Sequence, residues 1–159
     1  MGSVQRLNHA VLYVGDVEKS VAFYSGMLGF IGHSFPGAAF LRAEGSSNDH
    51  DLGLFAIGTQ TPGPQQGRRG LYHLAWQVDT IDDLTAIRVS LQEARALVGE
   101  SDHGASKSLY AQDPDGIEFE VMWATPQSAG PQEMGTRPLN LLAEQTQWSG
   151  VPTGHEANV

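Results

Sequence analysis

Leu7-Asn-His-Ala-Val-Leu-Tyr-Val14 recurs 64 residues later as Leu71-Tyr-His-Leu-Ala-Trp-Gln-Val78, and this repeated stretch decides the fold. Both copies are rich in β-branched and aromatic residues, which is typical of β-strands. Self-similarity at a fixed distance is the sequence signature of a duplicated structural unit. We therefore predict that two similar modules share the 159 residues of the chain.

The same order of elements follows each copy of this strand. Residues 16–29 and 82–93 both begin with acidic residues and continue as amphipathic stretches, and the first ends at Gly29, a residue typical of helix ends. Three shorter strands are expected after each helix, at residues 30–34, 38–43 and 51–57 in the first half and at 96–100, 106–112 and 117–124 in the second. Each half is therefore predicted to be a βαβββ unit, which makes the fold class α+β.

The predicted organisation is a single domain of residues 1–125 followed by an arm. Its two modules span about residues 5–58 and 70–124, and residues 59–69, which are rich in Gly, Pro and Gln, link them. The arm, residues 126–159, begins with turn-forming residues and contains one expected short helix within Leu139-Asn-Leu-Leu-Ala-Glu144. Edge strands and hydrophobic helix faces predict a homodimer.

Composition excludes several classes of protein. The chain has no cysteine, which excludes disulfide scaffolds and thiolate metal sites and leaves His, Asp and Glu as strong metal ligands. Nine Lys and Arg residues against 18 Asp and Glu give a formal charge of −9, with no positive stripe for nucleic acid. No apolar run approaches the ~18 residues of a membrane helix, and no signal-peptide pattern is present. We expect a cytoplasmic protein with no nucleic-acid or membrane partner.

His9 and His73 occupy equivalent positions of the repeated strand, each third from its start. They are either two core histidines inherited from one ancestor or two imidazoles that pseudo-twofold symmetry brings to a central cleft, where they would suit a divalent transition metal. The second reading needs an anionic third ligand. The last strand supplies Glu118 and Glu120, which alternation places on one face of that strand, and spacing does not choose between them.

With these motifs the chain resembles the vicinal oxygen chelate superfamily, which includes glyoxalase I, extradiol dioxygenases, fosfomycin-resistance transferases and bleomycin-resistance proteins. The resemblance covers about residues 5–125 and is carried by the duplicated pattern, by Val21-Ala-Phe-Tyr-Ser-Gly-Met-Leu-Gly-Phe30 and by Tyr110-Ala-Gln-Asp-Pro-Asp-Gly-Ile-Glu-Phe-Glu120. It implies that both modules form a shared metal-binding cleft. It also implies that the ligand is the glutamate four residues after the glycine of the Asp-Pro-Asp-Gly turn, Glu120, with Glu118 as the alternative.

Within the superfamily, further residues resemble the pocket of extradiol dioxygenases. His50 and His103 resemble its two non-ligand histidines, and Tyr110 resembles its tyrosine. For His50 the alternative is an exposed loop histidine, and for Tyr110 it is a packing role or the tyrosine that fosfomycin transferases carry at the same spacing. Their joint presence favours an enzyme in which Fe(II), or alternatively Mn(II), is bound by His9, His73 and Glu120. Such an enzyme would cleave the ring of a catechol-type aromatic diol with dioxygen.

Three other activities of the superfamily remain open at this stage. A Mn(II)-dependent thiol transferase would resemble this chain in its His, His and Glu ligands. A glyoxalase-type isomerase is less favoured because residues 52–57 contain no acid to serve as a fourth ligand, and Asp51 lies just outside them. A metal-free drug-binding protein of the bleomycin-resistance type would use the acidic surface, but it has no need of convergent metal ligands.

Overall fold

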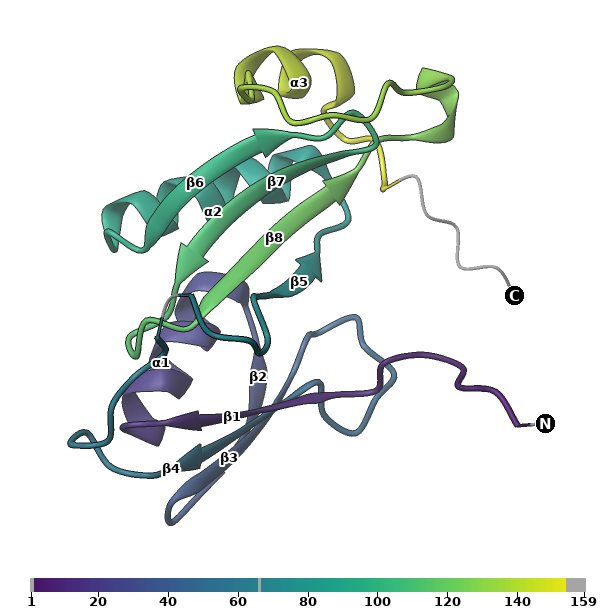
Figure 1. The fold of residues 1–159 in the computed structure, drawn as a ribbon. Helices are drawn as coiled ribbons and strands as arrows, with labels where there is room; N and C mark the ends of the chain where they lie inside the picture. Colours follow the sequence, from purple (N-terminus) through teal and green to yellow (C-terminus); the bar gives the residue numbers. More distant parts are fainter. Residues whose placement is uncertain (1, 66, 154–159) are drawn as a thin grey trace. The chain divides into compact units, whose positions relative to one another are not determined.

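The computed structural model describes residues 2–65 and 67–153, which form two four-stranded mixed sheets with helices packed on them (Figure 1). The elements are β1 (Ala10–Val14), α1 (Val17–Leu28), β2 (Ile31–Phe35), β3 (Ala38–Arg42), β4 (Leu52–Ala56), β5 (Leu74–Gln77), α2 (Ile81–Glu93), β6 (Leu97–Asp102), β7 (Ser106–Gln112), β8 (Glu118–Ala124), a 3-10 turn η1 (Gln127–Ala129) and α3 (Leu141–Trp148). The predicted α+β pair of βαβββ modules is confirmed.

Both sheets have the same strand order and the same directions. The first runs β1-β4-β3-β2 and the second β5-β8-β7-β6. In each, the first strand of the module pairs parallel with the last one, and the remaining pairs are antiparallel. The repeated sequence therefore corresponds to a repeated topology.

The strands that follow the repeated histidines begin later than predicted. The sequence placed their starts at residues 7 and 71, whereas β1 begins at Ala10 and β5 at Leu74. The register explains the difference, because Ala10 pairs with the first residue of β4 and Leu74 with the second residue of β8. A strand ends where its partner no longer offers backbone hydrogen bonds. His9 and His73 thus lie immediately before a strand rather than within one.

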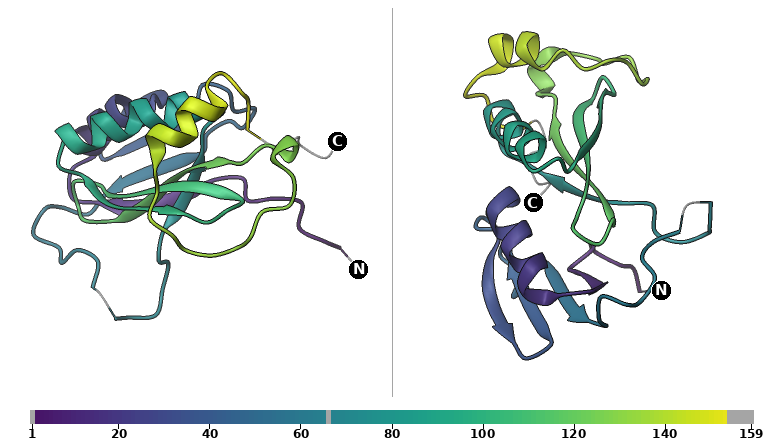
Figure 2. Two further views of the ribbon diagram at one scale, coloured as in Figure 1. Left: turned by 90° about the horizontal axis from the view of Figure 1, so that it is seen from above. Right: turned by 90° about the vertical axis from the view of Figure 1, so that its left-hand side faces the viewer.

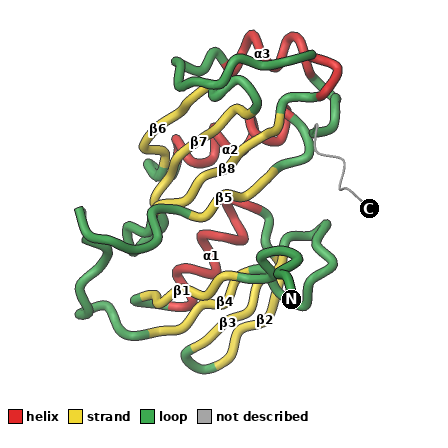
Figure 3. The backbone as a smooth tube through the Cα atoms, turned by 45° about the vertical axis from the view of Figure 1, so that its right-hand side comes forward, coloured by secondary structure: helices red, strands yellow, loops and turns green. Residues whose placement is uncertain are grey.

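Local capping explains where the two longer helices begin and end. The Asp16 side chain accepts a hydrogen bond from the Lys19 amide at 3.1 Å, and α1 ends at Gly29, whose φ of +68° is left-handed. In α2, Thr80 and Asp83 form a capping box, each side chain bonding the other's backbone. Figure 3 shows one helix along a face of each sheet.

Apolar side chains fill the space between each helix and its sheet. In the first module the core includes Leu12, Val14, Tyr24, Leu41, Leu52 and Leu54, and in the second it includes Ile81, Leu84, Leu91, Leu109, Phe119, Val121 and Trp123. The core residues that lie on strands alternate there with residues that point to the opposite face of the sheet, as the pleat requires. In each module, the side chains between these core residues therefore lie on the sheet face that does not contact the helix.

The chain divides into two compact units (Figure 2). One is residues 1–65 together with 113–116, and the other is residues 66–112 and 117–159. The Asp-Pro-Asp-Gly turn belongs to the first unit, where the Tyr24 hydroxyl donates to Asp113 Oδ2 and the Gly15 amide to Asp115 Oδ2, both at 3.0 Å. The arm belongs to the second unit. There, the ring centroids of Trp148 in α3 and Trp123 in β8 lie 6.5 Å apart. None of the helices in the described residues is both long and apolar enough to cross a membrane.

Candidate functional site

His73 and Glu120 form a half-buried pair in the second unit. The start of β5 and the middle of β8 are adjacent in register, and His73 Nε2 lies 3.0 Å from Glu120 Oε2. The two side chains are 23% and 12% exposed. His73 Nδ1 is buried and has no hydrogen-bond partner among the residues that the structure describes. An imidazole nitrogen and a carboxylate that meet in this way suit a divalent transition metal.

Glu118, the other acidic residue on this face of β8, has a different neighbour. The charge of Glu118, followed by a hydrogen bond to it, raises the pKa of Tyr72, an exposed residue just before His73. The geometry thus pairs Glu118 with Tyr72 and Glu120 with His73, and this difference favours Glu120 as the ligand.

Tyr110 and His103 extend the same group of side chains. Tyr110 on β7 pairs in register with Glu120, and its ring centroid lies 5.7 Å from that of His73. Its hydroxyl lies 2.8 Å from His103 Nε2. Burial raises the pKa of Tyr110, and the negative charge of Glu120 raises it further. The phenol therefore keeps its proton near neutral pH, and the structure brings four of the predicted site residues together.

The other two predicted residues meet in the first unit. His9 and His50 have ring centroids 4.4 Å apart, and Phe40 packs edge-on against His50 at 4.9 Å. His9 Nδ1 lies 2.9 Å from Asn8 Oδ1. Because the Asn8 amide nitrogen donates to Asn48, its oxygen faces His9, and His9 Nδ1 is the protonated nitrogen. The lone pair of His9 Nε2 is therefore left available for a metal. The contact from Asn8 that orients the His9 ring could not be predicted from the repeat.

The loop that carries His50 is built around Asp51. This buried carboxylate accepts hydrogen bonds from the Ala43 amide at 2.9 Å, from Ser46 Oγ at 2.8 Å and from Asn48 Nδ2 at 2.6 Å. Burial alone would raise the pKa of Asp51, but these hydrogen bonds outweigh it and lower the pKa below its usual value. In the sequence, Asp51 stands out only as an acid beside the strand, although Ser and Asn nearby are typical partners in such turns.

We expect the contribution of Asp51 to the stability of the folded protein to depend on pH. Since its folded pKa lies below the unfolded value of about 3.9, its stabilisation is complete above that value and is lost as the pH falls through the folded pKa. Asp51→Asn should lower the free energy of unfolding at pH 7 by about 1–3 kcal/mol. Urea unfolding should show the difference in free energy of unfolding between the wild type and Asp51→Asn become smaller as the pH is lowered toward 3. Asp49→Asn, a change at a fully exposed neighbour, should leave stability within about 0.5 kcal/mol, and a gap at Asp51 that ignored pH would contradict the assignment.

A pocket of about 480 Å³ lies over β2 and β3 of the first unit. It is lined by Ile31, Gly32, His33, Phe35, Phe40, Arg42 and Asp49. Its volume is within the range of about 300–1,000 Å³ that small-molecule pockets occupy. Phe40, which lines this pocket, also contacts the ring of His50.

The predicted three-ligand set is divided between the two units. His9 belongs to the first unit and His73 and Glu120 to the second. Throughout residues 2–65 and 67–153, no three His, Asp or Glu side chains gather closely enough to hold a metal ion. The donors that are present fit a divalent metal by type, and their assembly around one ion stays a prediction.

A pair of βαβββ modules with this strand order is the fold of the vicinal oxygen chelate class of proteins. The family model described as Glyoxalase/Bleomycin resistance protein/Dioxygenase superfamily matches residues 6–121, and the chain belongs to this superfamily.

Its relatives include enzymes with different activities. A catechol-2,3-dioxygenase of Bacillus subtilis is 28% identical over 77% of this chain, which spans only 42% of that protein. A metallothiol transferase FosB of Lysinibacillus sphaericus is 30% identical over 77% of this chain and 85% of its own. A biphenyl-2,3-diol 1,2-dioxygenase of Rhodococcus globerulus is 28% identical over 96% of this chain and 86% of its own.

Solved structures share the fold. A glyoxalase/dioxygenase from Nostoc punctiforme matches 79% of this chain and 99% of its own, with a TM-score of 0.62 and 21% identity. A fosfomycin resistance protein FosX from Listeria monocytogenes matches 77% and 96%, with a TM-score of 0.58 and 19% identity.

Proposed function

We propose that this protein is an extradiol dioxygenase that opens the ring of a catechol-type aromatic diol. The observation that carries the proposal is the continuous group His73, Glu120, Tyr110 and His103, in which a metal-binding pair adjoins a proton-transfer pair. Two dioxygenases acting on aromatic diols are among the relatives. His9 would complete the ligand set.

Fe(II), or alternatively Mn(II), would be held by His9, His73 and Glu120, and when bound it would orient the diol beside dioxygen and favour electron transfer between them. The remaining chemistry belongs to the chain. His50, half-buried between His9 and Phe40, can accept a proton from a diol hydroxyl. The Tyr110 hydroxyl is protonated at neutral pH and donates a hydrogen bond to His103 Nε2. It can relay a proton from the diol, giving its own proton to His103 Nε2 as it takes one from the diol hydroxyl.

A Mn(II)-dependent thiol transferase is the second candidate. The FosB relative favours it, because this chain matches 85% of that protein's length. The same three ligands would serve this reaction, and Tyr110 would then orient an epoxide oxygen instead of a diol. The two candidates differ in their need for dioxygen.

The decisive experiment compares these reactions on one preparation. Protein purified without oxygen and loaded with Fe(II) is mixed with simple, carboxylated and amino-acid-bearing catechols, while oxygen uptake and the yellow ring-opened semialdehyde are followed. We expect one dioxygen to be consumed for each diol cleaved, since both oxygen atoms enter the product. Absence of uptake in protein shown to contain Fe(II), together with consumption of glutathione by the Mn(II)-loaded protein in the presence of fosfomycin, would establish the transferase instead.

A further inference from the structure

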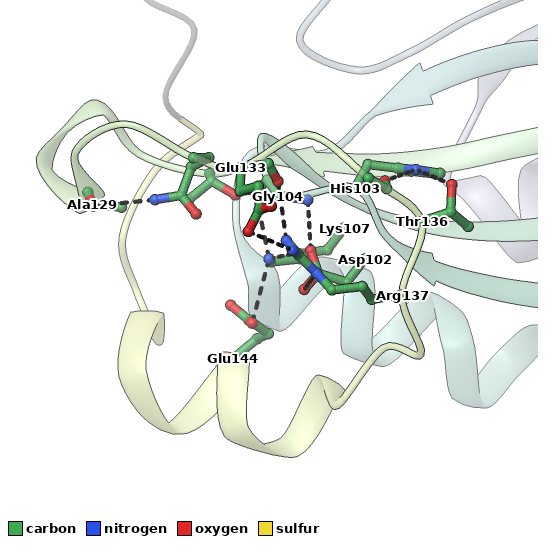
Figure 4. A network of polar contacts seen from close by, with 12 residues as sticks. Asp102, His103, Gly104, Lys107, Ala129, Glu133, Thr136, Arg137 and Glu144 are labelled. Carbon is green, nitrogen blue, oxygen red and sulfur yellow. Dashed lines mark hydrogen bonds and ion pairs between the residues drawn. The ribbon is translucent and has the colours of Figure 1, made fainter.

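The arm after β8 returns to the second sheet and pairs with the end of β6 (Figure 4). The Asp102 amide donates to the Arg137 carbonyl and the Arg137 amide to the Asp102 carbonyl, both at 2.9 Å. The superfamily match ends at residue 121, so this pairing is made by a part of the chain that the family model does not include.

Ion pairs also hold the arm against the second sheet, next to the backbone pairing of Asp102 and Arg137. Lys107, whose side chain is 5% exposed, lies 2.6 Å from Asp102 Oδ1 and 3.4 Å from Glu144 Oε1 of α3, and Arg137 Nε lies 3.8 Å from Asp102 Oδ2. Burial would raise the pKa of Asp102, but hydrogen bonds from Lys107 and the Gly104 amide, with the charges of Lys107 and Arg137, lower it. Asp102 is therefore ionised near neutral pH and binds both cations.

The fastened arm presents a backbone carbonyl to His103. His103 Nδ1 lies 3.0 Å from the Gly135 carbonyl oxygen and 3.4 Å from Thr136 Oγ1. A carbonyl oxygen only accepts hydrogen bonds, so Nδ1 carries the proton of the neutral ring. Nε2 is then the unprotonated nitrogen, and Tyr110 donates its hydroxyl proton to it at 2.8 Å.

We propose that residues 133–137 of the arm are a positioning segment that holds His103 in its Nδ1–H tautomer, so that Nε2 accepts the Tyr110 hydrogen bond and can take that proton when Tyr110 receives one from the diol. When the ring accepts that proton, its Nδ1–H keeps the Gly135 carbonyl as a partner and the imidazole need not turn. The structural part of this proposal stands by itself, and its effect on turnover rests on the proposed dioxygenase function.

Gly104 offers a way to displace the arm without changing the side chain of His103 or Tyr110. A Cβ at Gly104 would lie 2.2 Å from the Glu133 carbonyl oxygen, and the residue has a φ of +78°. Gly37, in the turn between β2 and β3, has the same φ of +78°, and a Cβ there meets nothing within 4 Å. Gly104→Ala and Gly37→Ala therefore share the backbone strain, and only the first collides with the arm.

The readout is the tautomer of His103 in metal-free protein labelled with ¹⁵N-histidine, measured by NMR at a pH where the ring is neutral. The His103 signals are identified by their loss in His103→Asn. We expect a protonated Nδ1 and an unprotonated Nε2 in the wild type and in Gly37→Ala, and a mixture of both tautomers in Gly104→Ala. An Nε2–H ring in the wild type, or an unchanged Nδ1–H ring in Gly104→Ala, would overturn the proposal.

A second pair of variants serves if Gly104→Ala does not fold. Arg137→Ala removes the side-chain contacts to Asp102 and to the Glu133 carbonyl, and Arg137→Lys keeps the charge. We expect the tautomer to become mixed in the first variant and to be restored in the second. In a chain that cleaves catechols, the displaced arm should also lower kcat about 10- to 100-fold at unchanged metal content. If the tautomer behaves as expected but the wild type cleaves no catechol, the dioxygenase function fails and the positioning role stands.

Discussion

Glu120→Gln is expected to abolish stoichiometric binding of Fe(II) or Mn(II), with a loss of affinity of at least about 100-fold. The amide removes the negative charge that His73 Nε2 now faces at 3.0 Å and offers a much poorer ligand oxygen. The measurement is anaerobic metal titration, together with metal content after desalting. His73→Ala and His9→Ala should show losses of the same order if both complete the ligand set.

Glu118→Gln is the matched control for this prediction. It makes the same chemical change two residues away on the same face of β8, beside Tyr72 instead of His73. We expect it to leave metal binding intact. The reverse result, with metal lost in Glu118→Gln and kept in Glu120→Gln, would make Glu118 the ligand, and retention in both variants would place the metal elsewhere.

His50→Ala is expected to keep its metal and lose about 10²- to 10⁴-fold in catechol turnover, the usual contribution of a general acid or base. His50 contacts His9 and Phe40 through its ring, and its loop is held by Asp51, so truncation should leave the loop in place. Oxygen uptake by the Fe(II)-loaded variant measures the rate, while metal content and melting temperature verify the site and the fold. Loss of the metal would identify His50 as a ligand, and an unchanged rate would identify it as a loop residue without a role in proton transfer.

Much of the fold could be predicted because duplication repeats the same signals twice. The strand at Ser106–Gln112 agrees with its predicted bounds, since its alternation and the following Asp-Pro-Asp-Gly turn are both local features. The starts of β1 and β5 could not be predicted in the same way. Apolar alternation continues to Leu7 and Leu71, but the strand ends where its partner does, and that information lies elsewhere in the chain.

The candidate site shows the same division. The histidine positions follow from the repeat, and the two glutamates follow from alternation along the last strand. The distinction between Glu118 and Glu120 depends on which side chain of the segment before β5 faces each one. The contact between His103 and Gly135 leaves no mark in the sequence, because the partner is a backbone carbonyl that any residue would supply. The role of the arm therefore required the structure.

A cut in the linker between the modules would not separate two self-sufficient fragments. The first would leave behind the turn at 113–116, so that the buried Tyr24 hydroxyl would lose its acceptor Asp113 and the Gly15 amide would lose Asp115. The second would carry Asp113 and Asp115 without the Tyr24 hydroxyl and the Gly15 amide that donate to them in the whole chain. Duplication has thus produced halves with similar folds, of which the first needs a turn from the second to complete its hydrogen bonds. We expect the two fragments to fold better when they are expressed together than when either is expressed alone.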